Sequence, residues 1–314
     1  MYALQSVIPY IGETRMWEID SESLAQYRKD RLNGQGHFAD RKPAMAGTVN
    51  KEIAVTATVL NLAFEDWGWI LQPRKLKRVK GKARCSYPLT REEQDALFKR
   101  LPWGDTACLF CVNTGLRKNE LFGLRWSDKV EIPELDSFAF ILVDTKNGED
   151  RPVICNSIAR NVIEHQEHKR KKLATDIRNA EMELLKPMDS KHRRRLERKI
   201  RRMRAVKKSP YVFPSFTGKK ISTISKMFNK AWIEAGLPDS PLVKKGIHNL
   251  RHTCGHRLRA CGVPDEDRDY LLGHNSVSLT QHYAAPDVKR LSEMAERIVE
   301  RRETTLLRVI RSVS

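Results

Sequence analysis

The sequence predicts a mainly α-helical protein with one small antiparallel β-sheet, built as a helical N-terminal domain followed by a larger α+β domain. Three observations predict this fold class. Apolar residues recur at helical spacing in several segments, two short apolar runs flank an Asn-Gly dipeptide, and 314 residues suit two domains better than one. A basic stretch near residues 73–86 separates the two groups of elements, so we expect domains over 1–80 and 87–314.

The N-terminal domain is expected to end in an amphipathic helix, because apolar side chains recur at helical spacing from Val49 to Phe64. Pro73 to Arg84 then carries seven Lys or Arg residues and little apolar content, which predicts an exposed basic linker. The linker residues that we expect to contact a polyanion are Arg74, Lys75, Lys77, Arg78, Lys80 and Lys82.

The C-terminal domain is expected to open with a helix after Thr90, because Thr90 and Glu93 form a capping box in which each side chain can bind the other's backbone N–H. An apolar helix over 106–113 should stop near Gly115. Further amphipathic segments that end at a glycine predict helices over 224–232 and 249–261.

The predicted sheet rests on two apolar runs, Phe138 to Val143 and Val153 to Ile154. They flank Asn147-Gly148, a dipeptide that suits a two-residue hairpin turn, so Lys146 should lie at a hairpin tip.

The charge balance favours a polyanionic partner. The chain carries 58 Lys or Arg residues against 39 Asp or Glu residues, a formal charge of +19, which suits nucleic acid. No apolar run approaches the twenty or so residues of a membrane span, and the N-terminus lacks the features of an export signal. We therefore expect no membrane association and a cytoplasmic, nucleoid-associated location in a bacterial or phage-host cell.

Cysteine usage fits an intracellular protein, since six cysteines are too few for a disulfide framework. Cys108 and Cys111 form a CxxC pair inside an apolar stretch, with no second pair at zinc-ribbon spacing. The sequence therefore predicts buried free thiols and no metal site here.

Most of the charge excess lies between His165 and Lys208, which holds 17 Lys or Arg residues against six Asp or Glu residues. Such density in one sign is typical of an exposed insertion, and Pro187 follows a break between two charged helices. Two interpretations stay open: a solvated insertion without a fixed role, or a DNA-gripping arm. The arm residues that we expect to bind DNA are Arg193, Arg194 and Arg195.

Two segments carry arginines suited to binding a phosphate. Arg117 follows Gly115 and stands at the start of a helix, where free N–H groups attract anions. His248 and Arg251 are one turn apart on one helix face, so a single phosphate could meet both. A lone Arg at a helix start is more often structural. The His248, His252 and His256 spacing also resembles a helical metal face, although the interposed Arg251 would repel a cation.

Two further segments could complete phosphoryl transfer. His274 is followed nine residues later by Tyr283, and a phenol becomes a phosphorus nucleophile when nearby arginines stabilise its anion. Lys146 could donate a proton to a leaving alkoxide. Taken singly, Tyr283 could be an ordinary buried tyrosine and Lys146 a solvated surface lysine, so the prediction depends on the whole set.

In their order along the chain, these segments resemble the active-site set of the tyrosine recombinase (phage integrase) family. Thr-Gly-Leu-Arg117 with Glu120-Leu121 resembles its first box and Lys146 its hairpin lysine. His248-x-Leu250-Arg251 resembles its second box, and Leu272-Gly273-His274 with Tyr283 resembles the remainder. The resemblance covers about 88–285, and it makes the helix over 49–71 similar to the last helix of the family's core-binding domain, which clamps duplex DNA.

The resemblance implies a site-specific recombinase that cuts and rejoins DNA without metal, ATP or other cofactor. Arg117, Arg251 and His274 would bind the scissile phosphate. Lys146 would protonate the departing 5′ hydroxyl, and His248 would assist proton movement at Tyr283, which forms a 3′-phosphotyrosine.

The implied partners are double-stranded attachment or recombination sites, other protomers in a tetrameric synapse, and accessory DNA-bending proteins. Asp287 to Ile310 has the pattern of a tail helix, which could dock on a neighbouring protomer or pack on its own domain. Two rival functions stay open: a type IB topoisomerase, which rejoins the same strand, and a catalytically inactive DNA-binding regulator.

Overall fold

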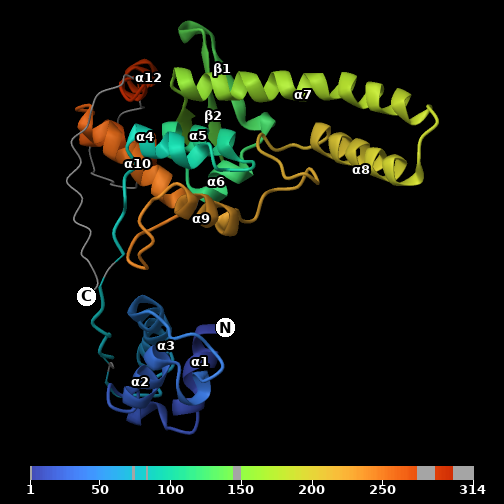
Figure 1. Cartoon of the computed structure of the whole chain (residues 1–314). Coiled ribbons are helices and arrows are strands. Elements are labelled where there is room, and N and C mark those ends of the chain that lie inside the picture. Colours follow the sequence, from blue (N-terminus) through green and yellow to red (C-terminus); the bar gives the residue numbers. More distant parts are fainter. Residues whose placement is uncertain (1, 73–74, 83, 144–149, 274–286, 300–314) are drawn as a thin grey trace. The chain divides into compact units, whose positions relative to one another are not determined.

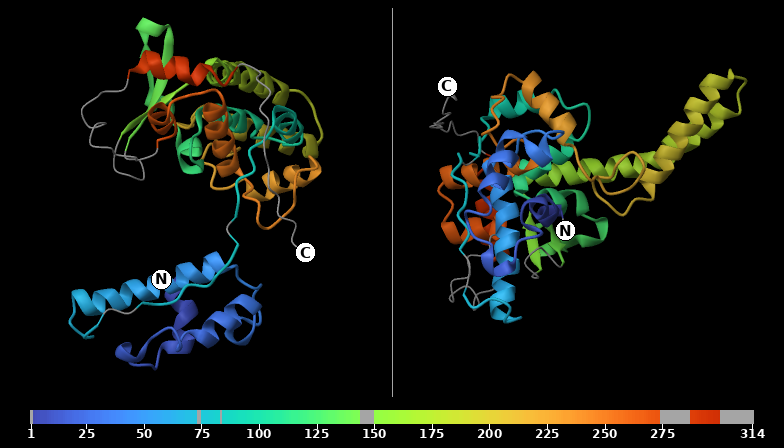
Figure 2. Two further views of the ribbon diagram at one scale, coloured as in Figure 1. Left: turned by 90° about the vertical axis from the view of Figure 1, so that its left-hand side faces the viewer. Right: turned by 90° about the horizontal axis from the view of Figure 1, so that it is seen from below.

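The computed structural model describes residues 2–72, 75–82, 84–143, 150–273 and 287–299. The chain divides into two compact units, an N-terminal unit (Met1–Arg84) and a C-terminal unit (Cys85–Ser314). The described part of the first unit is helical, and the second combines a small sheet with helices (Figures 1 and 2). The mainly helical fold with a small antiparallel sheet is confirmed. No helix within these ranges is both long and apolar enough to cross a bilayer.

The N-terminal unit packs three helices around one apolar core. These are α1 (Tyr2–Ile11), α2 (Ala25–Asn33) and α3 (Ala46–Glu65), with short 3-10 turns at Met16–Glu18 and Gly36–Phe38. The predicted amphipathic helix is α3, which buries Val49, Ile53 and Leu60 against Tyr27 and its neighbours.

The basic segment after α3 is not a free linker over residues 75–82. Val79 donates its backbone N–H to Asn50 Oδ1 (2.7 Å) and accepts from Asn50 Nδ2 (3.0 Å), and Leu76 packs on the same core. The predicted DNA-contact residues in this range are exposed: Lys75, Lys77, Arg78, Lys80 and Lys82. Arg74 lies outside the described residues.

Within the described residues the C-terminal unit has nine helices, of which α11 and α12 contact strand β3 (Arg151–Ile154), while α7 and α8 form a hairpin that projects from the unit. The helices are α4 (Arg91–Phe98), α5 (Asp105–Thr114), α6 (Lys118–Gly123), α7 (Ser157–Leu184), α8 (Ser190–Lys207), α9 (Ser225–Glu234), α10 (Ile247–Ala260), α11 (Asp265–Leu272) and α12 (Val288–Glu296). The capping box is confirmed: Thr90 Oγ1 accepts from the Glu93 N–H (3.2 Å), and Glu93 Oε2 accepts from the Thr90 N–H (2.9 Å).

The sheet has three antiparallel strands in the order β1 (Lys129–Ile132), β2 (Ser137–Leu142) and β3 (Arg151–Ile154). Leu142 pairs with Arg151, so eight residues connect β2 to β3. The predicted turn at Asn147-Gly148 falls among them, outside the described residues. Strand β1 was not predicted, because Lys-Val-Glu-Ile alternates polar and apolar residues over only four positions, which is too short a run to stand out.

Cys108 and Cys111, the CxxC pair on α5, are fully buried in the apolar core of the C-terminal unit. Burial raises the pKa of both thiols. Helix α12 packs on its own unit, with Leu291 and Ala295 buried against the cluster that includes Leu258 and Leu271. Of the two alternatives for the tail helix, residues 288–296 therefore follow packing on their own domain. Residues 300–314 lie outside the described part of the chain.

Candidate active site

The site begins where α5 ends and α6 starts. Gly115 closes α5 with φ +68°, and a Cβ there would meet Leu272 Cδ2 at 2.4 Å, so glycine allows α11 to approach closely. Arg117 follows as the N-cap residue of α6. Arg117 therefore lies next to the end of α11. His274 is the residue that follows Gly273 at this end of the helix.

Two acceptors fix the Arg117 side chain. Nη1 donates to Glu120 Oε1 (2.9 Å) and Nη2 donates to the Gly273 carbonyl (2.8 Å). Glu120 Oε2 also accepts from the Arg117 backbone N–H (2.8 Å). The guanidinium is thus oriented by one carboxylate and by the last turn of α11, which limits its rotamer freedom.

Arg251 reaches the same place from α10. Its side chain is buried, and Nη1 donates to the Gly115 carbonyl (2.7 Å). Its Nη2 is also buried, and within the described residues it has no hydrogen-bond partner. Burial, together with the charges of Arg117 and Arg151, lowers the pKa of Arg251 to about 10, which still leaves it cationic at neutral pH. One amino group therefore anchors the side chain and the other is available to an anion.

Glu120 and Arg151 also belong to this network, and the sequence alone predicts a catalytic role for neither. Arg151 on β3 donates from Nη2 to Glu120 Oε2 (2.8 Å), and its Nη1 lies 3.5 Å from the Leu271 carbonyl. A Cβ at Gly273 would meet Arg151 Nε at 2.4 Å, so β3 packs directly on the end of α11. Glu120 was visible as part of the first box, whereas Arg151 carries no local signal.

The charges around Glu120 explain its ionisation. Burial by itself would raise the pKa of its carboxyl group, but Arg151 and Arg117 outweigh burial and lower the pKa below the ordinary value. One carboxylate is therefore paired with two guanidinium groups, those of Arg117 and Arg151, while a third cation, Arg251, lies within reach of its charge. The cluster keeps a surplus of positive charge, which suits a dianionic or monoanionic phosphate group.

His248 stands in the first turn of α10, one turn from Arg251 and in contact with His252, whose ring centroid lies 4.6 Å away. Partial removal from water, followed by the charges of Arg251, Lys244 and Arg117, lowers the pKa of His248. The neutral imidazole is therefore favoured at neutral pH and can accept a proton.

The structure brings three of the six predicted catalytic residues together: Arg117, His248 and Arg251. The other three lie outside the described residues: Lys146, His274 and Tyr283. Their chain neighbours border the cluster, because His274 directly follows Gly273, and the segment with Lys146 ends at Arg151. Arg193, Arg194 and Arg195 lie on α8 and not in this cluster.

Residues 98–290, well over half of the chain, match the phage integrase family. The chain belongs to this family. The matched range contains all six predicted catalytic residues, so the family assignment and the geometry of the arginine cluster concern the same part of the molecule.

Two curated relatives support this assignment. A tyrosine recombinase XerC-like protein of Caldanaerobacter subterraneus subsp. tengcongensis is 30% identical over 184 residues, 55% of this chain and 42% of that protein. A shufflon-specific DNA recombinase of Escherichia coli is 28% identical over 163 residues, 49% of this chain and 40% of that protein. The matches thus span about two fifths of the relatives' lengths.

Solved structures of family members share the fold. A lambda integrase tetramer bound to a Holliday junction has a TM-score of 0.61 at 16% identity, and the match covers 98% of this chain and 73% of that one. A lambda integrase dimer bound to a COC′ core site has a TM-score of 0.59 at 15% identity and covers 98% and 90%. The XerH recombinase bound to its difH substrate gives 0.52 at 16% identity, covering 93% and 76%.

The lowered pKa of His248 gives a direct test of the site's electrostatics. In the DNA-free protein, the pKa of the His248 imidazole should lie below its ordinary value of 6.5, because burial disfavours the charged ring and charging it adds a cation beside Arg251 and Lys244. An NMR titration of the ring protons, assigned with His248→Gln, measures the midpoint. Lys244→Ala should move the midpoint upward, and a wild-type midpoint at or above 6.5 would contradict the arrangement.

Proposed function

We propose that this chain is a site-specific DNA recombinase that cuts and rejoins DNA through a 3′-phosphotyrosine at Tyr283. The observation that carries the proposal is the pair formed by Arg117 and Arg251, which are fixed against Glu120 and the Gly115 and Gly273 carbonyls. Among the residues that the structure describes, Arg251 Nη2 has no hydrogen-bond partner. In a member of this family, such a pair suits the two non-bridging oxygens of a scissile phosphate.

The proposed reaction exchanges one phosphodiester for another. The Tyr283 hydroxyl oxygen attacks phosphorus, and the bond from phosphorus to the 5′ oxygen breaks. The tyrosine proton passes toward His248, and Lys146 gives a proton to the leaving 5′ oxygen. Rejoining reverses each step with a 5′ hydroxyl from another duplex, so the phosphotyrosine bond conserves the energy and no ATP is consumed.

Arginine donors supply the stabilisation in this scheme. Negative charge grows on the non-bridging oxygens as the five-coordinate phosphorus forms, and Arg117, Arg251 and His274 would donate to them. Glu120 and Arg151 act as positioning residues, because they contact Arg117 and the end of α11 and not the reacting atoms. No step in this scheme is assigned to a metal ion or cofactor.

The proposed partners are duplex recombination sites and other copies of the chain. The lambda integrase structures are of a dimer on a core site and a tetramer on a Holliday junction. We propose a similar assembly of protomers on DNA for this chain, and accessory DNA-bending proteins as further partners. We also propose that five exposed basic residues of the N-terminal unit bind DNA as one half of a clamp. These residues are Lys75, Lys77, Arg78, Lys80 and Lys82.

A covalent trapping experiment tests the proposal. Duplexes bound by the Tyr283→Phe protein are first selected from a random library, then nicked next to the bound site so that the released fragment diffuses away. Wild-type protein should form a covalent adduct on a denaturing gel, and peptide mapping should place the DNA on Tyr283. The released end should accept phosphate from a polynucleotide kinase, because a 3′ linkage leaves a free 5′ hydroxyl.

Matched variants separate the outcomes. Tyr270→Phe also removes one phenolic hydroxyl from the same unit and should still form the adduct, whereas Tyr283→Phe should not. Sequence-selective binding without an adduct would overturn the enzyme and favour an inactive DNA-binding regulator. If the protein forms the adduct and relaxes supercoiled DNA but joins no strand to a second duplex, a type IB topoisomerase would be favoured.

A further inference from the structure

The basic insertion is a folded helical hairpin. Helix α7 starts inside the C-terminal unit, where Ala159, Val162 and Ile163 are buried, and then continues away from it, with α8 returning alongside (Figures 1 and 2). The hairpin has its own apolar seam, formed by Ile177, Ala180, Leu196 and Ile200, with Leu184, Met188 and Met203 packed against it. The charges of this segment are therefore held on a scaffold, which removes the interpretation of an unstructured solvated insertion.

Helix α8 carries many more positive charges than its ion pairs within the described residues neutralise. Ten of its 18 residues are Lys or Arg, and Glu197 is its one acidic residue. All ten basic side chains belong to exposed residues. Within the described ranges, Arg204 alone among them forms an ion pair, with Glu181 across the hairpin at 2.6 Å. Packing ten like charges on one short helix costs repulsion, so a polyanion would relieve a strain that the chain leaves in place.

Four of these side chains form a row along the outer face of α8. Lys191, Arg194, Arg198 and Arg201 follow one another at steps of three, four and three residues, which places them on one side of a helix. The seam residues Leu196 and Ile200 lie on the opposite side. We call these four residues the outer row. They extend over ten residues, or about 15 Å, a length that matches about four base pairs of a duplex.

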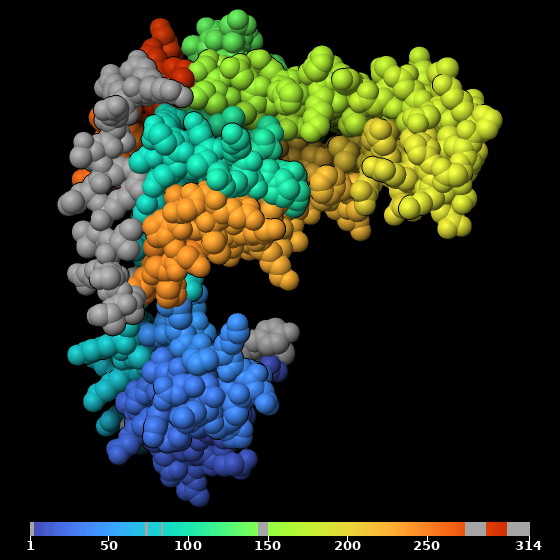
Figure 3. Space-filling view, in the orientation of Figure 1, coloured from blue at the N-terminus to red at the C-terminus, as the bar shows by residue number. Residues whose placement is uncertain are grey.

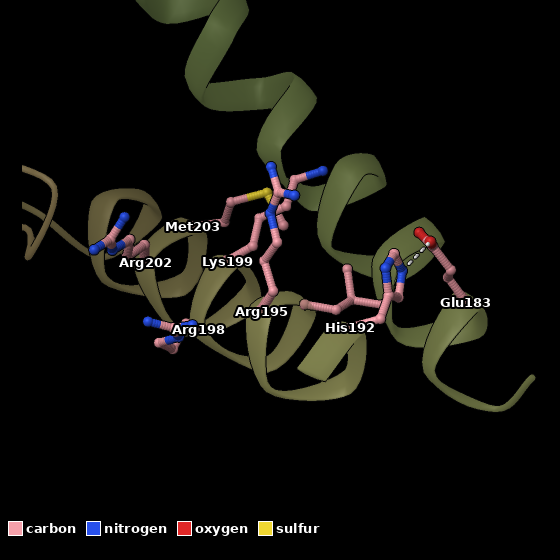
Figure 4. Close-up of a pocket in the computed structure, with 8 residues that line it drawn as sticks. Glu183, His192, Arg195, Arg198, Lys199, Arg202 and Met203 are labelled. Atoms are coloured by element: carbon pink, nitrogen blue, oxygen red, sulfur yellow. Dashed lines mark hydrogen bonds and ion pairs between the residues drawn. The ribbon is translucent and has the colours of Figure 1, made fainter. Parts of the chain in front are cut away.

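The positive surface continues from the hairpin to the body of the unit. A shallow hollow along the hairpin is lined by Arg195, Arg198, Lys199 and Arg202, near the pair of His192 with Glu183 (Figure 4). A second hollow of about 760 Å³ lies at the root of the hairpin, and Arg202 and Met203 line both. The basic residues of the second hollow are Lys169, Arg170, Arg202, Lys219 and Lys220, and Asp105 is the one acidic residue that lines it.

We propose that the α7–α8 hairpin is a second DNA-binding element that grips the phosphate backbone of the duplex through the outer row. The proposal rests on the proposed function, which supplies the duplex, and adds a contact outside the arginine cluster. Three of the four outer-row residues are arginines, whose planar forks pair with phosphate oxygens. The hairpin stands clear of the rest of the unit in the space-filling view, so a duplex can reach it (Figure 3).

Binding to a random-sequence 40-base-pair DNA duplex tests this element. The outer-row variant carries Lys191→Gln, Arg194→Gln, Arg198→Gln and Arg201→Gln in a Tyr283→Phe background, so binding is measured without cleavage. The seam is untouched, so helical content and thermal midpoint should stay near those of the parent. The slope of log K against log salt should become shallower by about 3.6, because four side chains are removed and each neutralised phosphate contributes about 0.9.

A control with the same charge change distinguishes a local contact from net charge. Lys99→Gln, Arg100→Gln, Arg259→Gln and Lys289→Gln remove four exposed cations of the same unit outside the hairpin. This control should change the slope by less than one. On a duplex selected for binding in the trapping experiment, hydroxyl-radical footprints should also shorten by about four base pairs at one end in the outer-row variant alone.

Several outcomes would overturn the proposal. An unchanged slope and footprint would make the outer row a solvated face, and an equal loss in the control would make the effect one of bulk charge. A loss seen with an RNA duplex of the same sequence but not with DNA would assign the hairpin to RNA. The trapping experiment reports separately: an adduct with an unchanged salt slope removes only the hairpin proposal, and a shallower slope without an adduct removes only the recombinase.

Discussion

Replacing Arg251 with lysine is expected to slow formation of the DNA adduct by about 10³-fold while leaving DNA binding within a few-fold of wild type. Lysine keeps the positive charge but cannot bond the Gly115 carbonyl and offer a second, rigidly placed donor at the same time. The lost interaction is strongest where charge builds on the phosphate oxygens, so the rate falls more than the affinity. Single-turnover cleavage of the nicked duplex and fluorescence anisotropy measure the two quantities.

Arg257 provides the matched control. It lies on the same helix, is similarly buried, and donates from Nη1 to Gln94 Oε1 (2.7 Å). Burial also lowers the pKa of Arg257 to about 10, so its environment is like that of Arg251. Arg257→Lys should therefore cost comparable stability and keep the cleavage rate within a few-fold. Equal loss of cleavage in both variants would mean that Arg251 acts through folding alone.

The fold could be predicted where local signals agree with the tertiary structure. The Thr90 capping box, the glycine ends of α5 and α10, and the apolar spacing of α3 each report a backbone requirement that is satisfied within one helix. Strand β1 could not be predicted because it is short and is specified by its pairing with β2. In that pairing Lys129 lies opposite Phe140, and Val130 lies opposite Ala139. Pairing of this kind leaves little trace in the strand's own residues.

The tail and the insertion show a different limit. Amphipathic spacing in residues 287–310 suits equally a groove on the same domain and a groove on a neighbour, and the contacts of α12 decide only for the part that is described. In the insertion, the apolar residues of the seam are few among many charges. Their pairing across the two helices could not be read from either helix alone, yet it makes the segment a hairpin.

The candidate site divides in the same way. Arg117, His248 and Arg251 were identified from short boxes because each acts from a helix start or a helix face. Arg151 could not be identified, since its partner Glu120 is 31 residues away and Leu271 is 120 residues away. The sequence also cannot show which donor of Arg251 is satisfied by the fold. These features arise only when α6, β3 and the end of α11 meet.

Glu120→Gln is expected to reduce both stability and cleavage, because Glu120 joins Arg117 and Arg151. The glutamine cannot neutralise Arg151, whose side chain is 12% exposed like that of Glu120, and breaking a largely buried pair by removing one partner costs about 3 kcal/mol. Cleavage should fall by about 10²-fold, since Arg117 loses the carboxylate that orients it. Glu167→Gln is the control: it removes a more exposed partner of Lys129, so it should cost less than about 1 kcal/mol and keep the cleavage rate.

The pH dependence separates loss of this charge from a general packing defect. Arg151 and Arg117 lower the pKa of Glu120 below its ordinary value of 4.5, so the folded state favours the ionised form more than the unfolded state does. The stabilisation is fully present above pH 4.5 and is lost as the pH falls through the folded-state pKa. Urea unfolding of wild type and Glu120→Gln should therefore show a gap in the free energy of unfolding that is wide at pH 7 and narrows below pH 4.5. A gap that stays constant over this range would mean that the carboxylate charge does not hold Arg117 and Arg151 in place.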